Sequence, residues 1–257
     1  MANQISLPEK IKIKEKEDNR YEVVIEPFHP GFGSTIGNAL RRALLSSLSG
    51  AAVTFFKIDG VQHEFDVIDG VKEDVVEIML NLKQLRVKMF TDEPVTLTLA
   101  GKGAKVLTGA DIDKNADVEV INKDMVIATL TDKSSAVSME ITVEKGLGYV
   151  TVEQREKERL EIGTIAIDSS FSPILNVGYN IEHVRVGKMT NYEKVTFDMI
   201  SDGTIDAETA LSQAATILDN HFALWADKSA AVEEEGDAEV EEENNEEEEG
   251  EEEETKK

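Results

Sequence analysis

Two amphipathic helical patterns, one near each end of the chain, constrain the fold more than any other feature. Between residues 34 and 50, apolar side chains recur every three or four positions, and a second such pattern covers 206–225. We expect Ser34 or Thr35 to cap the first helix and Gly50 to end it in a left-handed conformation. The segment between the two patterns is rich in β-forming residues. The sequence therefore predicts an α+β chain in which a discontinuous α/β subdomain, built from both ends, carries an inserted β-rich subdomain.

The remaining elements follow from shorter patterns. Alternation over Ile11–Lys14 and Tyr21–Glu26, with Asp18-Asn19 between them, predicts a β-hairpin. Val71–Leu85 has the period of a helix with a core-facing stripe, and Glu153–Glu161 is a highly charged connector. Asp206 is expected to cap the last helix. The strand candidates are Ala52–Ile58, Val61–Val67, Arg86–Phe90, Val95–Leu99, Val118–Ile121, Met125–Leu130, Ala136–Val143, Gly163–Asp168, Ile174–Val186 and Tyr192–Ile200.

The charge is concentrated at the end of the chain. Residues 229–257 hold 16 acidic residues and 2 lysines and so carry −14 of the formal net charge of −25. Such a segment has little apolar surface and repels itself, so we expect a disordered acidic tail. The rest of the chain is also acidic, which argues against a body that holds DNA by its phosphates.

No catalytic, metal or cofactor site stands out. The chain has no cysteine, its four histidines are scattered, and no serine has a convincing base partner. Gly31, Gly33 and Gly37 resemble a phosphate-binding loop, but their spacing departs from the dinucleotide fingerprint, and a tight turn with close packing is the commoner explanation. With no apolar run of membrane-spanning length and no signal-peptide pattern, we expect a cytoplasmic protein without a membrane contact.

The first helical pattern carries an unusual outer face. Arg41 and Arg42 flank Leu45 outside the apolar stripe, since residues three and four apart are neighbours on a helix. This arrangement suggests a surface meant for a partner. For a helix taken alone, two solvated arginines beside a partly buried leucine is the commoner interpretation.

Three blocks of sequence resemble a known family. FGSTIGNALRRALLSSLSGAAV, then IDGVQHEFDVIDGVKEDVVEIMLNLKQL, and DGTIDAETALSQAATIL at 202–218 are similar to the bacterial RNA polymerase alpha subunits. The resemblance covers about residues 5–228. It implies a dimerisation subdomain formed by 1–49 and 173–228, with a β-rich subdomain of 50–172 inserted. It also implies a non-catalytic subunit of a nucleotidyltransferase, which forms a homodimer and acts as the assembly platform for the beta and beta-prime subunits in transcription.

The resemblance also implies roles for individual residues. Those matching the dimer core are Phe32, Ile36, Leu40, Leu44, Leu211, Leu218 and Phe222. Those matching contacts with the large subunits are Arg42, Leu45, Lys83, Ile167 and Ile174. The resemblance thus gives the arginine-flanked leucine a partner.

The end of the chain departs from the family pattern. Alpha subunits usually continue through a linker into a compact domain that binds upstream promoter DNA, whereas an acidic tail follows here. We therefore expect this chain to meet DNA only indirectly, through the assembled enzyme. Two other hypotheses remain open: a nucleotide-binding enzyme that uses the glycine loop, and a tail that mimics nucleic acid.

Overall fold

The computed structural model describes residues 5–155 and 161–227. The chain divides into two compact units, Met1–Ala215 and Thr216–Lys257, and each is described by itself. None of the helices within the described ranges is long and apolar enough to cross a membrane.

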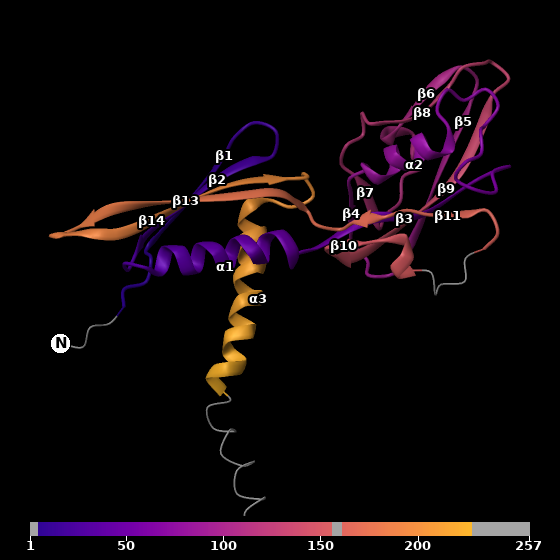
Figure 1. Ribbon diagram of the computed structural model, residues 1–257. Helices are drawn as coiled ribbons and strands as arrows, with labels where there is room; N and C mark the ends of the chain where they lie inside the picture. Colours follow the sequence, from indigo (N-terminus) through magenta and orange to yellow (C-terminus); the bar gives the residue numbers. More distant parts are fainter. Residues whose placement is uncertain (1–4, 156–160, 228–257) are drawn as a thin grey trace, which may run out of the picture. The chain divides into compact units, whose positions relative to one another are not determined.

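The first sheet joins the beginning of the chain to its end (Figure 1). Its antiparallel strands follow the order β1-β2-β14-β13, with β1 at Lys10–Glu15, β2 at Arg20–Phe28, β14 at Met189–Ser201 and β13 at Ile174–Val186. The predicted hairpin is confirmed as β1 and β2. Asp18 and Asn19 turn it with φ of 58° and 57°, a left-handed conformation that these two residue types tolerate.

Helix α1 (Phe32–Ser46) packs on β13 and β14 of this sheet (Figure 1). Two glycines of α1 allow the close approach. A Cβ on Gly33 would lie 2.6 Å from Glu193 Oε2, and one on Gly37 would lie 3.1 Å from the Tyr179 ring. The glycine spacing thus serves packing, because a Cβ at either position would require Glu193 or Tyr179 to shift.

The predicted cap of α1 is wrong. The helix begins after Gly31, at φ 87°, and the hydroxyls of Ser34 and Thr35 donate to the Gly31 carbonyl instead of accepting from helix N–H groups. The Glu193 carboxylate of β14 takes that role, accepting from Gly31 N at 3.0 Å and Gly33 N at 2.8 Å. A carboxylate from another element satisfies the exposed N–H groups and matches the positive end of the helix dipole.

The predicted role of Gly50 is also wrong. Helix α1 ends at Ser46, and Gly50 lies within the next strand, β3 (Ser49–Ile58). A Cβ on Gly50 would lie only 1.9 Å from the Phe171 carbonyl oxygen. Glycine is therefore needed here because two backbones come close together.

The β-rich part between the ends confirms the α+β class. Its largest sheet has the order β5-β9-β3-β4-β7, and β11 also pairs with β3. The bounds are β4 Val87–Met89, β5 Val95–Lys102, β7 Val118–Val120, β9 Ala136–Leu147 and β11 Thr164–Ala166. Two short ladders pair β6 (Lys105–Thr108) with β8 (Val126–Leu130) and β10 (Tyr149–Val150) with β12 (Ser169–Ser170).

Val61–Val67 forms turns and bends, so the predicted strand there is wrong. The charged connector begins with a 3₁₀ turn at Val152–Arg155, another such turn occurs at Gly109–Asp111, and residues 156–160 of the connector lie outside the described residues. The proposed subdomain boundaries stay a prediction.

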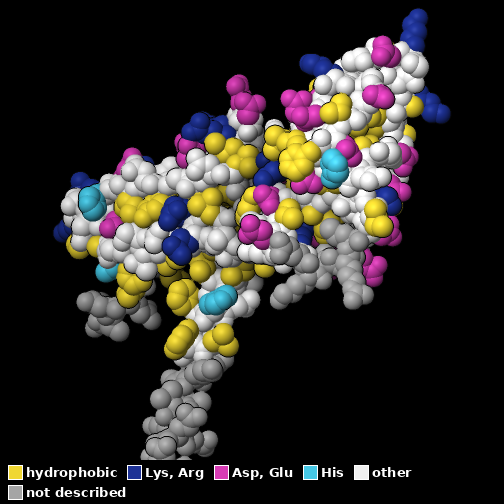
Figure 2. Space-filling model, turned by 45° about the vertical axis from the view of Figure 1, so that its right-hand side comes forward, with side chains coloured by type: hydrophobic (Ala, Val, Ile, Leu, Met, Phe, Trp, Pro, Cys, Tyr) yellow, Lys and Arg dark blue, Asp and Glu magenta, His cyan; other side chains and the backbone are white. Residues whose placement is uncertain are grey.

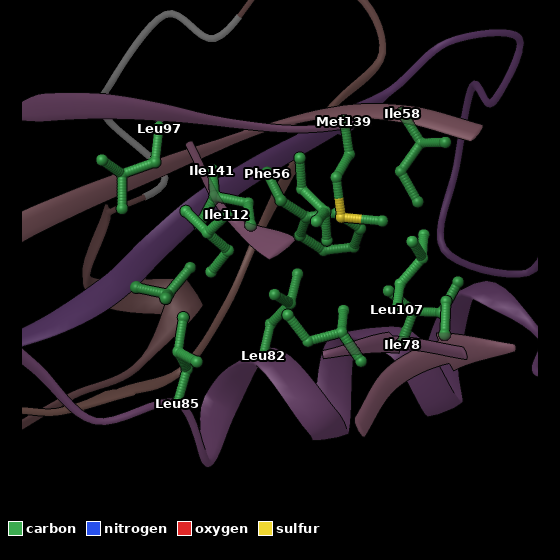
Figure 3. Packing of buried hydrophobic residues seen from close by; sticks show 14 of the residues in the cluster. Phe56, Ile58, Ile78, Leu82, Leu85, Leu97, Leu107, Ile112, Met139 and Ile141 are labelled. Atoms are coloured by element: carbon green, nitrogen blue, oxygen red, sulfur yellow. The ribbon is translucent and has the colours of Figure 1, made fainter. Parts of the chain in front are cut away.

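Helix α2 (Val75–Lys83) packs on the large sheet and buries its apolar stripe. Ile78 and Leu82 point toward Phe56, Met139 and Ile141 of β3 and β9 (Figure 3). All five side chains are at most 1 % exposed. The stripe was therefore predicted correctly as a core-facing surface.

The predicted start of α2 at Val71 is four residues too early. Asp74 is the cap, because its side chain accepts from Glu77 N at 2.7 Å. Glu73 is drawn out of the helix, since its carboxylate accepts both the N–H and the hydroxyl of Thr129 on β8. Tertiary hydrogen bonds thus override the helical period here.

Helix α3 (Ala207–Asp227) runs from the first unit into the second. Asp206 accepts from Thr209 N at 2.7 Å, so its predicted capping role is confirmed. In the first unit the buried residues of α3 are all alanines, Ala207, Ala210 and Ala214. In the second unit Phe222 and Trp225 are 63 % and 79 % exposed, and Figure 2 shows hydrophobic side chains along the helix.

Candidate protein-interaction surfaces

An apolar groove of about 620 Å³ lies between the β1–β2 hairpin, α1 and the first part of α3. Its exposed hydrophobic side chains include Ile11, 65 % exposed, and Ile13, 40 % exposed, which alternate with lysines along β1. The whole lining consists of Pro8, Ile11, Ile13, Ile25, Phe28, Ile36, Leu40, Glu208, Leu211, Ser212 and Ala215. Continuous apolar surface of this kind on a chain usually marks a contact with another protein.

The groove brings together only some of the residues predicted for a dimer core. Ile36, Leu40 and Leu211 line it, and Phe32 is 39 % exposed at the start of α1. Leu44, in contrast, is fully buried within its own chain. The other two, Leu218 and Phe222, belong to the second unit. The dimer role of these residues stays a prediction.

Sequence reasoning missed the contribution of the hairpin to this groove. Five lining residues come from the segment before α1, namely Pro8, Ile11, Ile13, Ile25 and Phe28. The signal was present in the sequence, because an edge strand that alternates isoleucine with lysine has an apolar face and needs something to cover it.

The outer face of α1 presents the predicted arginine-flanked leucine. Arg42 is exposed and Leu45 is partly buried. Arg41 donates to the side chain of Asn38 at 3.1 Å, whereas no residue in the described ranges accepts a hydrogen bond from the Arg42 guanidinium. Arg42 thus carries an exposed fork of donors that a carboxylate on another protein would satisfy.

A second polar site surrounds Lys83, in the last turn of α2. Lys83 Nζ donates to Tyr149 Oη at 3.1 Å, and Tyr149 Oη donates to Asp168 Oδ2 at 3.0 Å. Asp168 Oδ2 also lies 3.7 Å from Lys83 Nζ. Its other oxygen accepts from Val152 N at 2.9 Å. We call Lys83, Tyr149 and Asp168 the Lys83 cluster.

The cluster holds Asp168 in its ionised form. The hydrogen bond from Val152 N is the main reason that the pKa of Asp168 lies below its usual value. Burial opposes this shift, and the hydrogen bond from the Tyr149 hydroxyl and the charge of the Lys83 ammonium lower the pKa further, each by a smaller amount than burial raises it. The carboxylate is thus a fixed negative charge beside Lys83 at neutral pH.

A shallow depression of about 430 Å³ opens beside Lys83. It is lined by Gln62, His63, Glu64, Met79, Leu80, Lys83, Val152, Thr164, Ile165, Ala166, Ile167 and Asp168. Leu80 is 49 % exposed at its rim, whereas Ile167 is 1 % exposed. Ile174 is likewise 3 % exposed. The role of both isoleucines in large-subunit contact stays a prediction.

Two further kinds of site were considered, a metal site and an anion site at the start of α1. No group of three or more histidine, aspartate or glutamate side chains within 5–155 and 161–227 could hold a metal ion. The helix start that resembled a phosphate loop already has an anion, because Gly31 N and Gly33 N donate to the Glu193 carboxylate. A phosphate at this position would have to displace that carboxylate.

Comparison with known proteins gives concordant matches. The model of the RNA polymerase Rpb3/RpoA insert domain matches residues 56–172. The chain is 50 % identical over 230 residues to the DNA-directed RNA polymerase subunit alpha of Symbiobacterium thermophilum, across 87 % of this chain and 73 % of that protein. It is 46 % identical over 226 residues to the subunit alpha of Moorella thermoacetica, across 88 % of this chain and 72 % of that protein.

Proposed function

Because this chain belongs to the family of the DNA-directed RNA polymerase alpha subunits, we propose that it forms a homodimer on which the beta and beta-prime subunits assemble. The chain is thus a subunit of a nucleotidyltransferase, and the proposal gives it a structural role in that enzyme. As part of the same proposal, the dimer works in the cytoplasm with the transcription machinery.

The apolar groove is the observation that carries the dimer proposal. Its floor combines residues from α1 and α3, the two helices that the family resemblance assigns to the dimer contact, with the apolar face of β1. A two-fold interface with a second copy would remove Ile11 and Ile13 of both copies from water. Each square ångström of apolar surface covered in this way contributes about 25 cal/mol.

Two other surfaces support contact with the large subunits. Arg42 offers an exposed guanidinium beside Leu45 on α1, and Lys83 stands at the edge of the depression on α2. Since the same surfaces occur on both copies while beta and beta-prime differ, each copy would engage a different subunit. Assembly on a symmetric dimer therefore has to break its symmetry.

Sedimentation equilibrium of the full chain at micromolar concentration tests the first half of the proposal. We expect a dimer whose mass does not change over the micromolar range. A stable single protomer at these concentrations would overturn the scaffold role.

Reconstitution with purified beta and beta-prime subunits tests the second half. We expect the dimer to capture beta and then beta-prime in a complex that survives size-exclusion chromatography. Failure of a folded dimer to retain either large subunit would contradict the platform role and leave the dimer itself standing.

A further inference from the structure

The ammonium group of Lys83 is held more firmly than that of an ordinary surface lysine. Its side chain is 32 % exposed, and its Nζ is fixed by a hydrogen bond to Tyr149 Oη and by the charge of Asp168 at 3.7 Å. Asp168 is itself fixed by Val152 N and by the Tyr149 hydroxyl. An exposed lysine usually samples many rotamers, and that freedom is lost when it binds a partner.

The three members of the Lys83 cluster come from three separate elements. Lys83 ends α2, Tyr149 lies on β10, and Asp168 precedes β12. The antiparallel β10–β12 ladder pairs Tyr149 with Ser170, which places the tyrosine hydroxyl within reach of Asp168. The fold thus brings a hydroxyl and a carboxylate from other elements to one lysine beside the depression.

The support leaves part of Lys83 available. An ammonium group has three N–H donors, and the cluster offers Nζ one hydroxyl at 3.1 Å and one carboxylate oxygen at the longer distance of 3.7 Å. At least one donor thus remains for an acceptor on another protein. The exposed Leu80 lies on the same helix and lines the same depression.

We propose that Tyr149 and Asp168 are positioning residues for large-subunit capture, and that they act by holding Lys83 ready for an acceptor on the partner. The partner segment combines a carboxylate or a backbone carbonyl for Lys83 with an apolar side chain for Leu80. This inference rests on the proposed function. Its physical basis is preorganisation, since a lysine that is already fixed loses less conformational freedom on binding.

A double-mutant cycle on the full chain tests the inference. The binding of purified beta and beta-prime subunits is measured for wild type, Lys83→Ala, Tyr149→Phe and the double variant. We expect about tenfold weaker binding for Lys83→Ala and about threefold weaker binding for Tyr149→Phe. In the Lys83→Ala background, Tyr149→Phe should have no further effect, because its only route to the partner is gone.

Two further variants keep the experiment specific. Asp168→Asn should weaken binding about as much as Tyr149→Phe. Lys102→Ala, which removes an exposed lysine on β5, should bind like wild type. Thermal unfolding of every variant shows whether the fold is retained, and a folded Asp168→Asn variant decides the question if Tyr149→Phe is unstable.

The outcomes distinguish the contact made by Lys83 from the positioning role of Tyr149 and Asp168. If Lys83→Ala binds like wild type, Lys83 makes no contact and the proposed large-subunit role of Lys83 fails. If Lys83→Ala weakens binding but the effect of Tyr149→Phe is absent, or persists undiminished in the double variant, the positioning role is overturned while the contact stands.

Discussion

The apolar groove and the Lys83 cluster represent two different ways of preparing a surface for a partner. In the groove, exposed isoleucines of β1 lie beside α1 and the start of α3, and nearly all of the lining is apolar. In the Lys83 cluster, one cation is fixed by a hydroxyl and a carboxylate beside a small depression. The first surface gains affinity from area alone, whereas the second gains specificity from the direction of a few polar contacts.

The difference suggests that the two surfaces bind different kinds of partner. An apolar groove suits a permanent partner that is always present, such as a second copy of the chain. A preorganised polar site suits a partner that must be distinguished from others. We therefore expect the two surfaces to respond independently to substitution, and the following predictions test that independence.

The largest effect is expected for a charge placed in the groove. Ile11→Asp should weaken the dimer by at least about a hundredfold, because the second copy would have to bury an unpaired carboxylate. Sedimentation from nanomolar to micromolar concentration measures this. Val106→Asp on β6, another exposed strand position, is the control and should leave the dimer intact. Equal dimers for both variants would show that the groove is not the interface.

Removing the carboxylate that caps α1 should have the next largest effect. Glu193→Ala leaves Gly31 N and Gly33 N without their acceptor, so the free energy of unfolding should fall by about 1–2 kcal/mol. Urea denaturation measures the loss, and Glu140→Ala, at an exposed position of β9, is the control. Glu193→Gln should lose less, since the amide oxygen still accepts one bond. Unchanged stability of Glu193→Ala would refute the capping role.

Arg42→Ala, on the outer face of α1, should have a smaller effect, and it should affect the capture of a large subunit but not the dimer. Because Arg42 is exposed on α1 and does not line the groove, the dimer should persist while capture of beta weakens about fivefold. Arg41→Ala is the matched control, since Arg41 already bonds to Asn38. Binding assays with purified beta give the affinity, and monomers in sedimentation would contradict the prediction.

The smallest effect concerns the ionisation of Asp168. Its folded-state pKa is lowered, chiefly by Val152 N, so its stabilisation is complete above the pH at which free aspartate titrates, about 4. That contribution is lost as the pH falls through the folded-state value. Asp168→Asn should therefore lower the free energy of unfolding by less than about 1 kcal/mol at pH 7, because the pair is partly exposed.

The urea midpoints of wild type and Asp168→Asn should accordingly approach each other as the pH is lowered from 7 through the folded-state pKa of Asp168. A gap between the two proteins that stays constant from pH 7 to pH 3 would show that the charge of Asp168 does not contribute.

Much of the fold could be predicted from local patterns. The β1–β2 hairpin followed from alternation around Asp18-Asn19, and the buried stripe of α2 followed from its helical period. Two predictions that were wrong, the cap of α1 and the start of α2, concern features that depend on residues distant in the sequence. Glu193 caps α1 from 160 residues away, and Thr129 draws Glu73 out of α2. No local pattern contains such partners.

The candidate sites also contain both predictable and unpredictable residues. Ile36, Leu40 and Leu211 were predictable as apolar positions on helices, and they do line the groove. The surroundings of Lys83 were not predictable, because Tyr149 and Asp168 meet only through the β10–β12 ladder. The burial of Leu44 and Ile167 within their own chain was not predictable either, since it depends on which elements cover them.

The joining of β2 to β14 has a consequence for how the chain folds as it is synthesised. Tyr21 and Val23 pair with residues 197 to 199, so the first hairpin must wait for nearly the whole chain before its sheet can close. The sheet of β3, β4, β5, β7, β9 and β11 needs nothing beyond Ala166, the last residue of β11. The strands from β3 to β11 can thus pair before β14 has been synthesised, whereas β2 has to wait for β14 to emerge from the ribosome.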